Sequence, residues 1–209
     1  MDRPLRLVVA TRNRGKTAEF ARLLGADFRV EALPHDCPLP DESGGTFAEN
    51  ALIKARHAFQ CLGGGQAVLA DDSGLEVAVL QGRPGVLSAR YAGELADDRA
   101  NLTKLLADLA PHTDRSGRFV CVLALVMPTA VIEDELERVY LAEGVLEGTL
   151  EDTPRGGGGF GYDPVFRPHG WAHTLAELSP AEKDSVSHRG RAVGELLRVL
   201  GTEGIVDDA

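Results

Sequence analysis

The spacing of apolar and polar residues predicts strands and helices that alternate along the chain. Residues 5–10 form a short, β-branched apolar run that ends at polar residues, which is typical of a buried strand. Residues 16–24 and 46–62 instead repeat apolar side chains at three- and four-residue steps, the period of an amphipathic helix. Strands are also expected at 66–70, 75–80, 118–127 and 137–142, and helices at 97–109 and 191–200. The pattern predicts an α/β fold with a mixed sheet.

Local signals sharpen the helix boundaries. Thr46 and Glu49 form a capping box, in which each side chain can satisfy the other residue's backbone N–H. Ser179 and Glu182 repeat this arrangement, with Pro180 at the first helical position. Three glycines at 63–65 end the helix predicted at 46–62. No repeat, low-complexity tract or linker interrupts the sequence, so we expect one domain over residues 1–209.

Composition narrows the functional classes. The chain has 209 residues, 44% of them hydrophobic, which is enough for a well-buried core. Its net charge of −10 argues against binding along DNA or RNA, and leaves a small anionic ligand as the expected partner. Its three cysteines are odd in number and form no CxxC pair, which indicates reduced thiols. No apolar run is long enough for a signal peptide core or a membrane span, so a soluble cytoplasmic protein is expected.

A basic segment follows the first predicted strand. The turn between a strand and a helix presents free N–H groups and the positive end of the helix dipole to an anion. Cationic side chains add to this effect inside an otherwise acidic protein, although a solvated basic turn is the alternative. The candidate phosphate-binding residues are Thr11, Arg12, Asn13, Arg14, Gly15 and Lys16.

The same segment also fits a relaxed P-loop pattern. Residues 15–17 read Gly-Lys-Thr, and residues 67–71 resemble the strand that carries a metal-binding aspartate in such proteins. Against this reading, the loop is filled with Thr, Arg, Asn and Arg, which suit a backbone phosphate cradle poorly. A P-loop NTPase therefore remains an alternative hypothesis.

The sequence Asp71-Asp72-Ser73-Gly74 follows the strand predicted at 66–70. Two carboxylates and a hydroxyl at this position suit Mg²⁺ and an attacking water. Successive side chains along a strand point apart, so the two aspartates need not bind one ion. The same four residues are also a common β-turn sequence. Two acidic residues after Pro40, Asp41 and Glu42, could complete a metal site. Glu49 is a weaker candidate because it already has a capping role.

Two segments nearer the C-terminus supply groups for a nucleobase. Residues 155–164 formally match GxGxxG, but no predicted strand precedes the match and Asp163-Pro164 stands where a helix should begin, so a dinucleotide fingerprint is rejected. The remaining glycine loop presents Phe160, whose ring can stack on a base. Residues 183–191 add hydrogen-bond donors, although a surface His-Arg pair and a buried Phe are the alternatives.

Taken in order, these motifs resemble a known family. TRNRGK, FAENALIKARHA, ADDSGLEV, GRPGVLSARYAG, GGFGYDPVF and ELSPAEKDSVSHRGRAV are similar to the inosine triphosphate pyrophosphatases that cleanse the purine nucleotide pool. The resemblance runs from about residue 5 to residue 200 without a missing block. It implies a mixed twisted sheet flanked by helices, two lobes around a central nucleotide-binding cleft, and a homodimer.

The resemblance also implies roles by position. Asp72 would be the metal-linked catalytic carboxylate with Asp71 beside it, and Asp41 would add a metal contact, although Asp41 and Glu42 remain alternatives. Lys54 would join the triphosphate contacts of the basic segment, and Ser73 would also bind the substrate. Base and sugar would be held by Phe160, Gly161, Tyr162, Asp163, Lys183, His188 and Arg189.

The expected activity is Mg²⁺-dependent hydrolysis of ITP, dITP and XTP to the monophosphate and pyrophosphate. Hypoxanthine and xanthine carry an O6 acceptor and an N1 donor, whereas adenine reverses both, so donors facing O6 would discriminate against ATP. The alternatives are a P-loop NTPase that releases orthophosphate, a non-catalytic purine nucleotide sensor, and a pyrophosphatase acting on pyrimidine triphosphates.

Overall fold

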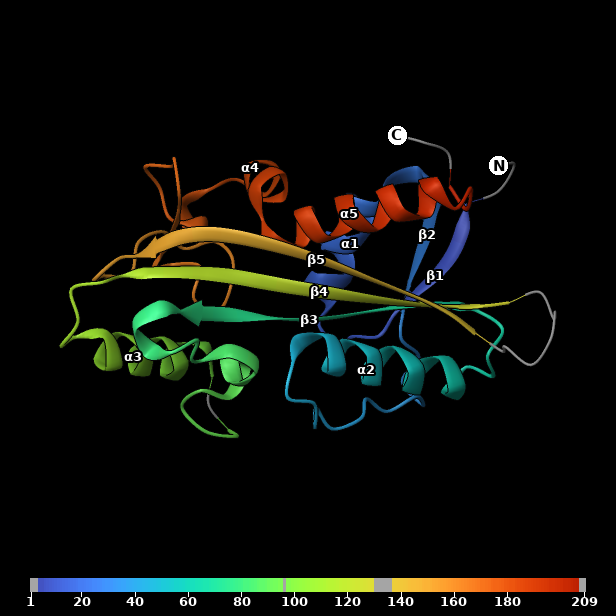
Figure 1. The fold of residues 1–209 in the computed structure, drawn as a ribbon, viewed down its shortest axis with the longest axis horizontal. Helices are drawn as coiled ribbons and strands as arrows, with labels where there is room; N and C mark the ends of the chain where they lie inside the picture. The colour runs from blue at the N-terminus through green and yellow to red at the C-terminus, as the bar shows by residue number, and fades with distance from the viewer. Residues whose placement is uncertain (1–3, 96, 130–136, 207–209) are drawn as a thin grey trace. The chain divides into compact units, whose positions relative to one another are not determined.

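The computed structural model describes residues 4–95, 97–129 and 137–206 (Figure 1). Its strands form a six-stranded sheet with the order β2-β1-β3-β4-β5-β6. β1 pairs in parallel with both β2 and β3, whereas β5 and β6 are antiparallel, so the predicted mixed α/β sheet is confirmed. The strands are β1 (Leu5–Val9), β2 (Phe28–Ala32), β3 (Ala67–Val77), β4 (Ser116–Pro128), β5 (Glu137–Leu150) and β6 (Phe166–Pro168). The helices are α1 (Arg14–Leu24), α2 (Phe47–Cys61), α3 (Asp98–Leu109), α4 (Pro180–Val186) and α5 (His188–Thr202).

The chain divides into two compact units. The first comprises residues 1–72, 121–144 and 189–209, and the second comprises residues 73–120 and 145–188. Each unit has its own hydrophobic core.

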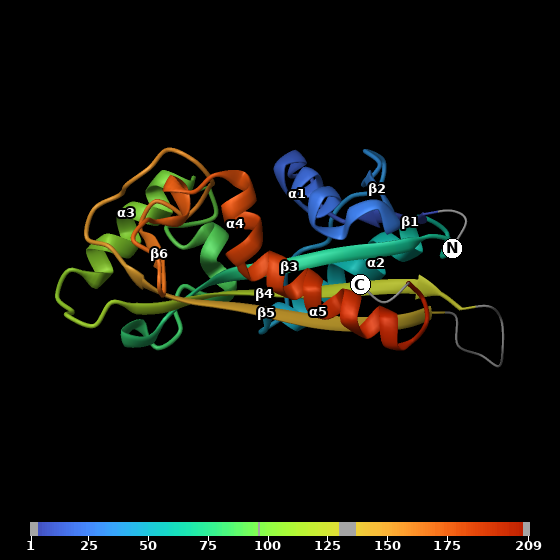
Figure 2. The same cartoon turned by 90° about the horizontal axis from the view of Figure 1, so that it is seen from above.

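In the first unit, helices cover both faces of the sheet because its strands are apolar on both sides. Leu7 and Val9 of β1 pack in one cluster with α1 and α5, whereas Val8, between them, packs in another cluster with α2. This is the alternation that a strand requires. Figures 1 and 2 show α1 and α5 on one side of these strands and α2 on the other. Side chains from the two faces therefore meet different helices.

The second unit is built around a cluster of leucines and aromatic residues from α3 and the ends of the long strands. Asn101 of α3 is buried, and its side chain donates to the carbonyl of Ala89 and accepts from the N–H of Ala92. The hydroxyl of Tyr162 donates to the carbonyl of Ser88 at 2.7 Å. These bonds tie the segment around residues 88–92 to α3 and to the glycine loop.

The capping signals in the sequence locate two helices well. The Thr46–Glu49 capping box is formed at the start of α2, and the Ser179–Glu182 box is formed at the start of α4, with Pro180 in its first turn. The last helix begins at His188, earlier than the expected 191. The helix starts that the two capping boxes predicted, at α2 and α4, are confirmed.

The strand boundaries needed more correction. The expected end of a strand at residue 70 is wrong, because β3 runs from Ala67 to Val77 through all four residues of the Asp-Asp-Ser-Gly sequence. Residues 78–80, expected in a strand, form a 3₁₀ turn, and the N–H of Gly82 closes it on the carbonyl of Val77. β5 continues to Leu150 rather than ending at 142, and β2 had no counterpart among the expected strands.

Candidate active site

Asp71 and Asp72 lie within β3 and leave it on opposite faces. Leu69, two residues before Asp71, packs on the side of α1 and α5, whereas Ala70, two residues before Asp72, packs on the side of α2. Both aspartates are buried, with 3% and 7% of their surface exposed. Two neighbouring carboxylates in the sequence therefore belong to two different sets of contacts.

The α2 side chains surround Asp72. Lys54 Nζ lies 2.9 Å from Asp72 Oδ1, and Asn50 Nδ2 donates to Asp72 Oδ2 at 3.2 Å. Lys54 Nζ also lies 2.8 Å from Glu42 Oε1. Burial acts to lower the pKa of Lys54, but the surrounding carboxylates outweigh it and the pKa is raised. A charged ammonium group thus joins two carboxylates in a nearly buried setting.

Cations from α1 and α5 surround Asp71. Lys16 Nζ lies 2.8 Å from Asp71 Oδ2, and Arg189 Nε lies 3.5 Å from the same oxygen. Arg189 is itself 2% exposed, and its Nη1 lies 3.6 Å from Glu19 Oε2. Arg189 was expected to hold the base, and the structure instead gives its guanidinium two carboxylate neighbours.

These surroundings move the pKa values of the two carboxyl groups in opposite directions. Burial acts to raise the pKa of Asp71, but the positive charges around it outweigh burial and hold that pKa well below its usual range. Burial raises the pKa of Asp72, and Glu42 adds to this effect, while Lys54 opposes it. Asp71 is therefore held as an anion, and the pKa of Asp72 is shifted in the opposite direction.

The donors around Asp72 fit a hard divalent cation. Asp72 and Glu42 both place a carboxylate oxygen within 3 Å of one positive charge, the ammonium group of Lys54. No group of three or more His, Cys, Asp or Glu suited to a metal occurs within the described ranges. Mg²⁺ requires no such cage, because it is commonly held by one or two carboxylates together with substrate phosphates and water. Of the two acidic candidates left open by the sequence, Glu42 is the one beside Lys54 and Asp72.

The basic turn before α1 is internally bonded. Asn13 is the N-cap of α1, and its Oδ1 accepts from the N–H groups of Gly15 at 2.8 Å and Lys16 at 3.2 Å. Thr11 Oγ1 accepts from the Asn13 N–H at 3.1 Å. Lys16 is thus aimed at Asp71 from a capped helix start, while Arg14 is exposed.

Arg12 anchors the neighbouring loop. Its guanidinium donates to the carbonyls of Leu33 at 3.1 Å and Pro34 at 2.9 Å, and it also bonds the carbonyl of Cys37. Arg12 was expected to bind phosphate, and several of its N–H groups donate to the backbone of residues 33–37, close in sequence to Glu42.

In the second unit, the glycine loop presents an aromatic ring beside a cation. Phe160 is 40% exposed, and Lys183 Nζ lies 4.8 Å from the centre of its ring. Asp163 Oδ2 accepts from the Phe160 N–H at 2.8 Å and lies 2.5 Å from Lys183 Nζ. The Gly161 N–H donates to Asp98 Oδ2 of α3 at 2.8 Å. The loop is thereby held from both sides.

Other residues expected to contact base and sugar are buried. Tyr162 is 4% exposed, and its hydroxyl bonds Ser88. The ring of His188 is 3% exposed and stacks on Phe119, with 4.8 Å between ring centres. Among the predicted base contacts of this unit, Phe160 and Lys183 are the two whose side chains are not buried.

Comparison with known proteins decides the family. The sequence model of the Ham1 family matches residues 7–199, almost the whole chain. The chain belongs to the Ham1 family. A dITP/XTP pyrophosphatase of Mycobacterium tuberculosis is 49% identical over 203 residues, which are 93% of this chain and 95% of that protein. A dITP/XTP pyrophosphatase of Geobacter sulfurreducens is 47% identical, and the match covers 96% of this chain and 98% of that protein.

Solved structures agree with this assignment. The Ham1 protein of Coxiella burnetii matches with a TM-score of 0.82 and 42% identity, covering 95% of this chain and 99% of that one. The Staphylococcus aureus Ham1 protein gives a TM-score of 0.81 at 39% identity, with coverage of 95% and 99%. The family resemblance inferred from the ordered motifs is therefore confirmed, and the fold is that of Ham1 proteins.

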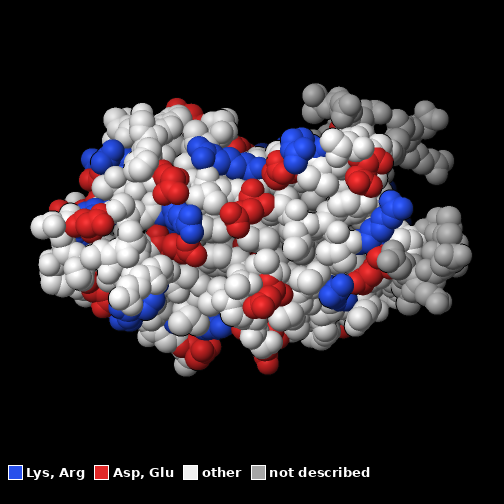
Figure 3. Space-filling model, viewed as in Figure 1, with Lys and Arg blue, Asp and Glu red and all other residues white. Residues whose placement is uncertain are grey.

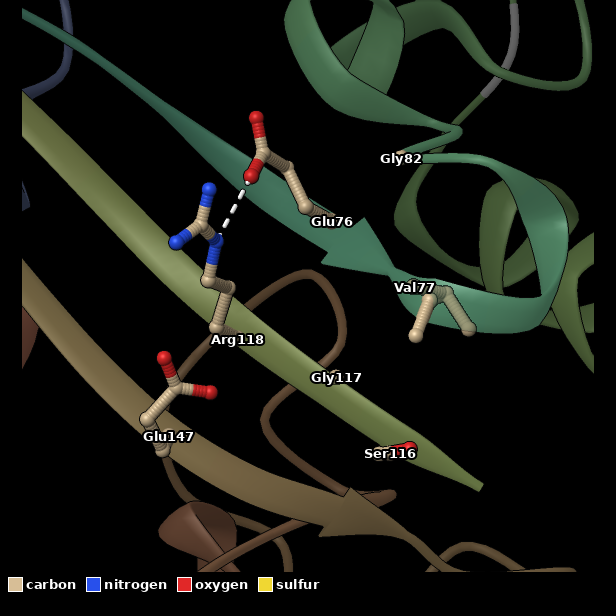
Figure 4. A pocket seen from close by; sticks show the side chains of 8 residues that line it. Glu76, Val77, Gly82, Ser116, Gly117, Arg118 and Glu147 are labelled. Atoms are coloured by element: carbon tan, nitrogen blue, oxygen red, sulfur yellow. Dashed lines mark hydrogen bonds and ion pairs between the residues drawn. The ribbon is translucent and has the colours of Figure 1, made fainter. Parts of the chain in front are cut away.

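The second unit of this Ham1 protein contains a cavity. It has a volume of about 280 Å³ and is lined within the second unit by the ends of β3, β4 and β5 (Figure 4). Arg118, whose Nε lies 2.8 Å from Glu76 Oε2, shares the lining with Glu147. Two carboxylates against one guanidinium do not suit a triphosphate, and the lining contains none of the predicted site residues.

Two important contacts in the Ham1 site were missed by the sequence reasoning. Neither Asn50 nor Glu19 was among the predicted site residues. Both are buried, at 0% and 6% exposure. Asn50 contacts Asp72 directly, and Glu19 contacts Arg189, which in turn contacts Asp71. A polar residue on the apolar stripe of α2 was the available signal for Asn50.

Proposed function

We propose that this Ham1 protein is a Mg²⁺-dependent nucleoside triphosphate pyrophosphatase that converts ITP, dITP and XTP to the monophosphate and pyrophosphate. Its relatives at 47–49% identity are named dITP/XTP pyrophosphatases, and they match it over nearly their full length. The observation that carries the chemistry is the arrangement of Glu42, Lys54 and Asp72, in which carboxylate donors and a cation converge.

Asp72 and Glu42 would hold Mg²⁺ in this proposal. The ion would supply charge neutralisation at the phosphates and lower the pKa of a bound water. Asp41, the metal contact first expected, has weaker support than Glu42, because Glu42 shares the Lys54 ammonium group with Asp72.

Asp72 would accept the proton of the water that attacks the α-phosphorus. Lys54 and Asn50 hold the two oxygens of this carboxylate, and a general base must be positioned within reach of the proton it accepts. Lys16 and Lys54 would meet the negative charge that develops on the departing pyrophosphate. Asp71 would fix Lys16 and Arg189 through their ion pairs, which makes it a positioning residue.

Phe160 and Lys183 would hold the purine. Stacking of a base on an aromatic ring contributes about 1–3 kcal/mol. The Lys183 ammonium group is a donor, which suits the O6 acceptor of hypoxanthine and xanthine. Replacing Phe160 with Leu would test this, because it keeps an apolar side chain and removes the ring face. We expect the KM for dITP to rise about tenfold, and an unchanged KM would contradict stacking.

Product analysis tests the activity itself. The protein with Mg²⁺ is given ITP, dITP, XTP, ATP, GTP and dTTP in separate reactions, and monophosphate, diphosphate, pyrophosphate and orthophosphate are quantified. We expect pyrophosphate with the first three. Orthophosphate with a diphosphate would indicate the P-loop alternative, tight binding without products would indicate a sensor, and preferred cleavage of dTTP would indicate pyrimidine specificity.

The remaining expectations concern partners and location. No helix within the described residues is long and apolar enough to cross a membrane. On the face shown in Figure 3, basic and acidic side chains are interspersed, without the basic stripe that follows a nucleic-acid backbone. We propose a cytoplasmic homodimer that acts on free nucleotides, and sedimentation of the purified protein tests its oligomeric state. The central cleft implied by the family resemblance stays a prediction.

A further inference from the structure

Asn50 is a fully buried polar side chain with both ends bonded. Its exposure is 0%. Its Nδ2 donates to Asp72 Oδ2 at 3.2 Å, and its Oδ1 accepts from the Gly44 N–H at 2.8 Å. A buried amide must satisfy both its donor and its acceptor, and here the two partners come from different parts of the chain.

On one side, α2 holds both oxygens of Asp72. Lys54 lies one helical turn after Asn50, so both side chains project from the same face of the helix. Lys54 Nζ contacts Asp72 Oδ1 at 2.9 Å, while Asn50 contacts Oδ2. Two donors on two oxygens restrict rotation of the carboxylate plane, which neither donor would do alone.

On the other side, Asn50 holds the loop that carries Glu42. Gly44 follows Glu42 by two residues, and the next N–H groups, of Gly45 and Thr46, are bonded by Glu49 Oε2 at 2.7 and 3.1 Å. A Cβ at Gly44 would stand 2.7 Å from Asn50 Oδ1, so glycine is what permits this approach. The loop and the strand are thus joined through one amide.

We propose that Asn50 is a positioning residue that orients Asp72 and sets its spacing from Glu42. The inference rests on the proposed pyrophosphatase function, in which both carboxylates serve the reaction. Only a carboxamide of this length offers a donor to Asp72 and an acceptor to Gly44. Aspartate has the same shape but no proton to donate when ionised, and alanine has neither group.

This difference yields a pair of informative variants. Asn50→Asp keeps an acceptor for the Gly44 N–H and replaces the donor facing Asp72 with a like charge. Asn50→Ala removes both contacts. Gln60→Ala, an exposed position on the same helix, is the control for changes in α2 that touch neither carboxylate. Circular dichroism and urea unfolding establish that each variant is folded.

Hydrogen exchange at the Gly44 amide and turnover of dITP are measured on all four proteins. We expect Asn50→Ala to accelerate Gly44 exchange at least tenfold and Asn50→Asp to leave it near the wild-type rate. Both should lower kcat at least tenfold with less than a threefold change in KM, while Gln60→Ala changes neither.

Two results would overturn the proposal. If Asn50→Ala and Asn50→Asp both retain a kcat within twofold of an active wild type, the donor does not orient Asp72. If Gly44 exchange is unchanged in Asn50→Ala, the amide does not anchor the loop. A wild-type protein that releases no pyrophosphate contradicts the proposed function itself, and this result is distinct from variants that match an active wild type.

Discussion

Asp71 and Asp72 are adjacent in sequence, equally acidic in solution and similarly buried, yet they occupy opposite electrostatic environments. Asp71 has Lys16 and Arg189 around one oxygen, and its pKa is lowered despite burial. Asp72 shares one ammonium group with Glu42, and its pKa is raised. The difference arises from strand geometry, because one residue of offset directs each side chain to a different layer of helices.

The two faces of β3 thereby serve two tasks, holding phosphate-binding groups and recruiting a metal ion. On the α1 and α5 side, two cations, Lys16 and Arg189, contact the single β3 carboxylate of Asp71, and Glu19 also contacts Arg189. This arrangement suits holding phosphate-binding groups in place. On the α2 side, carboxylates outnumber the cation, which suits recruiting a divalent metal. Substitutions that treat the two aspartates alike should therefore have unlike effects.

The largest expected effect is on turnover by Asp72→Asn. The amide cannot accept the proton of the attacking water, and a positioned base typically contributes 10²–10⁴-fold. We expect kcat for dITP to fall by about that range with the fold intact, whereas Asp71→Asn should lose less. Steady-state rates of pyrophosphate release measure both.

Equal losses in the two variants, or a near-normal rate for Asp72→Asn, would end the distinction between a catalytic and a positioning aspartate. A matched urea midpoint for Asp72→Asn and the wild type is the control that separates chemistry from unfolding.

Asp71→Asn should instead have its main effect on stability. Removing the charge takes away the buried carboxylate that Lys16 and Arg189 share, while Arg189 keeps Glu19 as a second neighbour. Breaking a buried ion pair costs about 3–5 kcal/mol. Urea unfolding at pH 7 measures this change. Destabilisation below about 1 kcal/mol would show that the cations find other partners.

The same variant should have a characteristic pH dependence. A carboxyl group whose pKa is lowered by folding stabilises the protein fully above its unfolded value of about 3.9, and this contribution declines as the pH falls from there toward the folded value. The stability gap between wild type and Asp71→Asn should therefore be constant from pH 7 to 5 and narrow below pH 4. A gap that widens on acidification would contradict the lowered pKa.

How much of this could be read from the sequence depended on the range of the interactions. The Thr46–Glu49 capping box is local, so the start of α2 was predicted correctly. The Asp-Asp-Ser-Gly sequence has equally local turn preferences, but ion pairs from Lys16 and Lys54 occupy the carboxylates and β3 continues through them.

The site followed the same rule. Basic and acidic segments marked the chemistry, because charged residues beside apolar runs are visible in one dimension. Partner choice was not visible: that Arg12 bonds the loop at 33–37, or that Asn50 contacts Asp72, depends on distances between segments far apart in sequence.

A smaller effect, on the affinity for a divalent ion, is expected when the cation beside Asp72 is removed. Lys54→Met removes the ammonium group that Glu42 and Asp72 share, so a divalent ion should bind there more tightly, by about tenfold. Because a ligand stabilises the form that binds it, Mn²⁺ should raise the Tm of Lys54→Met more than that of the wild type. Lys16→Met, on the Asp71 side, is the matched control and should respond like the wild type. Identical shifts in all three proteins would remove Glu42 and Asp72 as metal ligands.

The smallest effect on turnover is expected from Thr17→Ala. This variant tests which side of β3 carries the metal. In a P-loop reading, Thr17 would bind Mg²⁺ together with Asp71, and Thr17→Ala would abolish activity. In the structure the Thr17 hydroxyl donates to the Asn13 carbonyl at 3.4 Å within the first turn of α1. Losing one neutral hydrogen bond at a helix start costs about 0.5–1.5 kcal/mol of stability and no chemistry. We therefore expect Thr17→Ala to keep kcat within twofold and to show an unchanged Mg²⁺ dependence; a loss of a hundredfold or more would move the metal to Asp71.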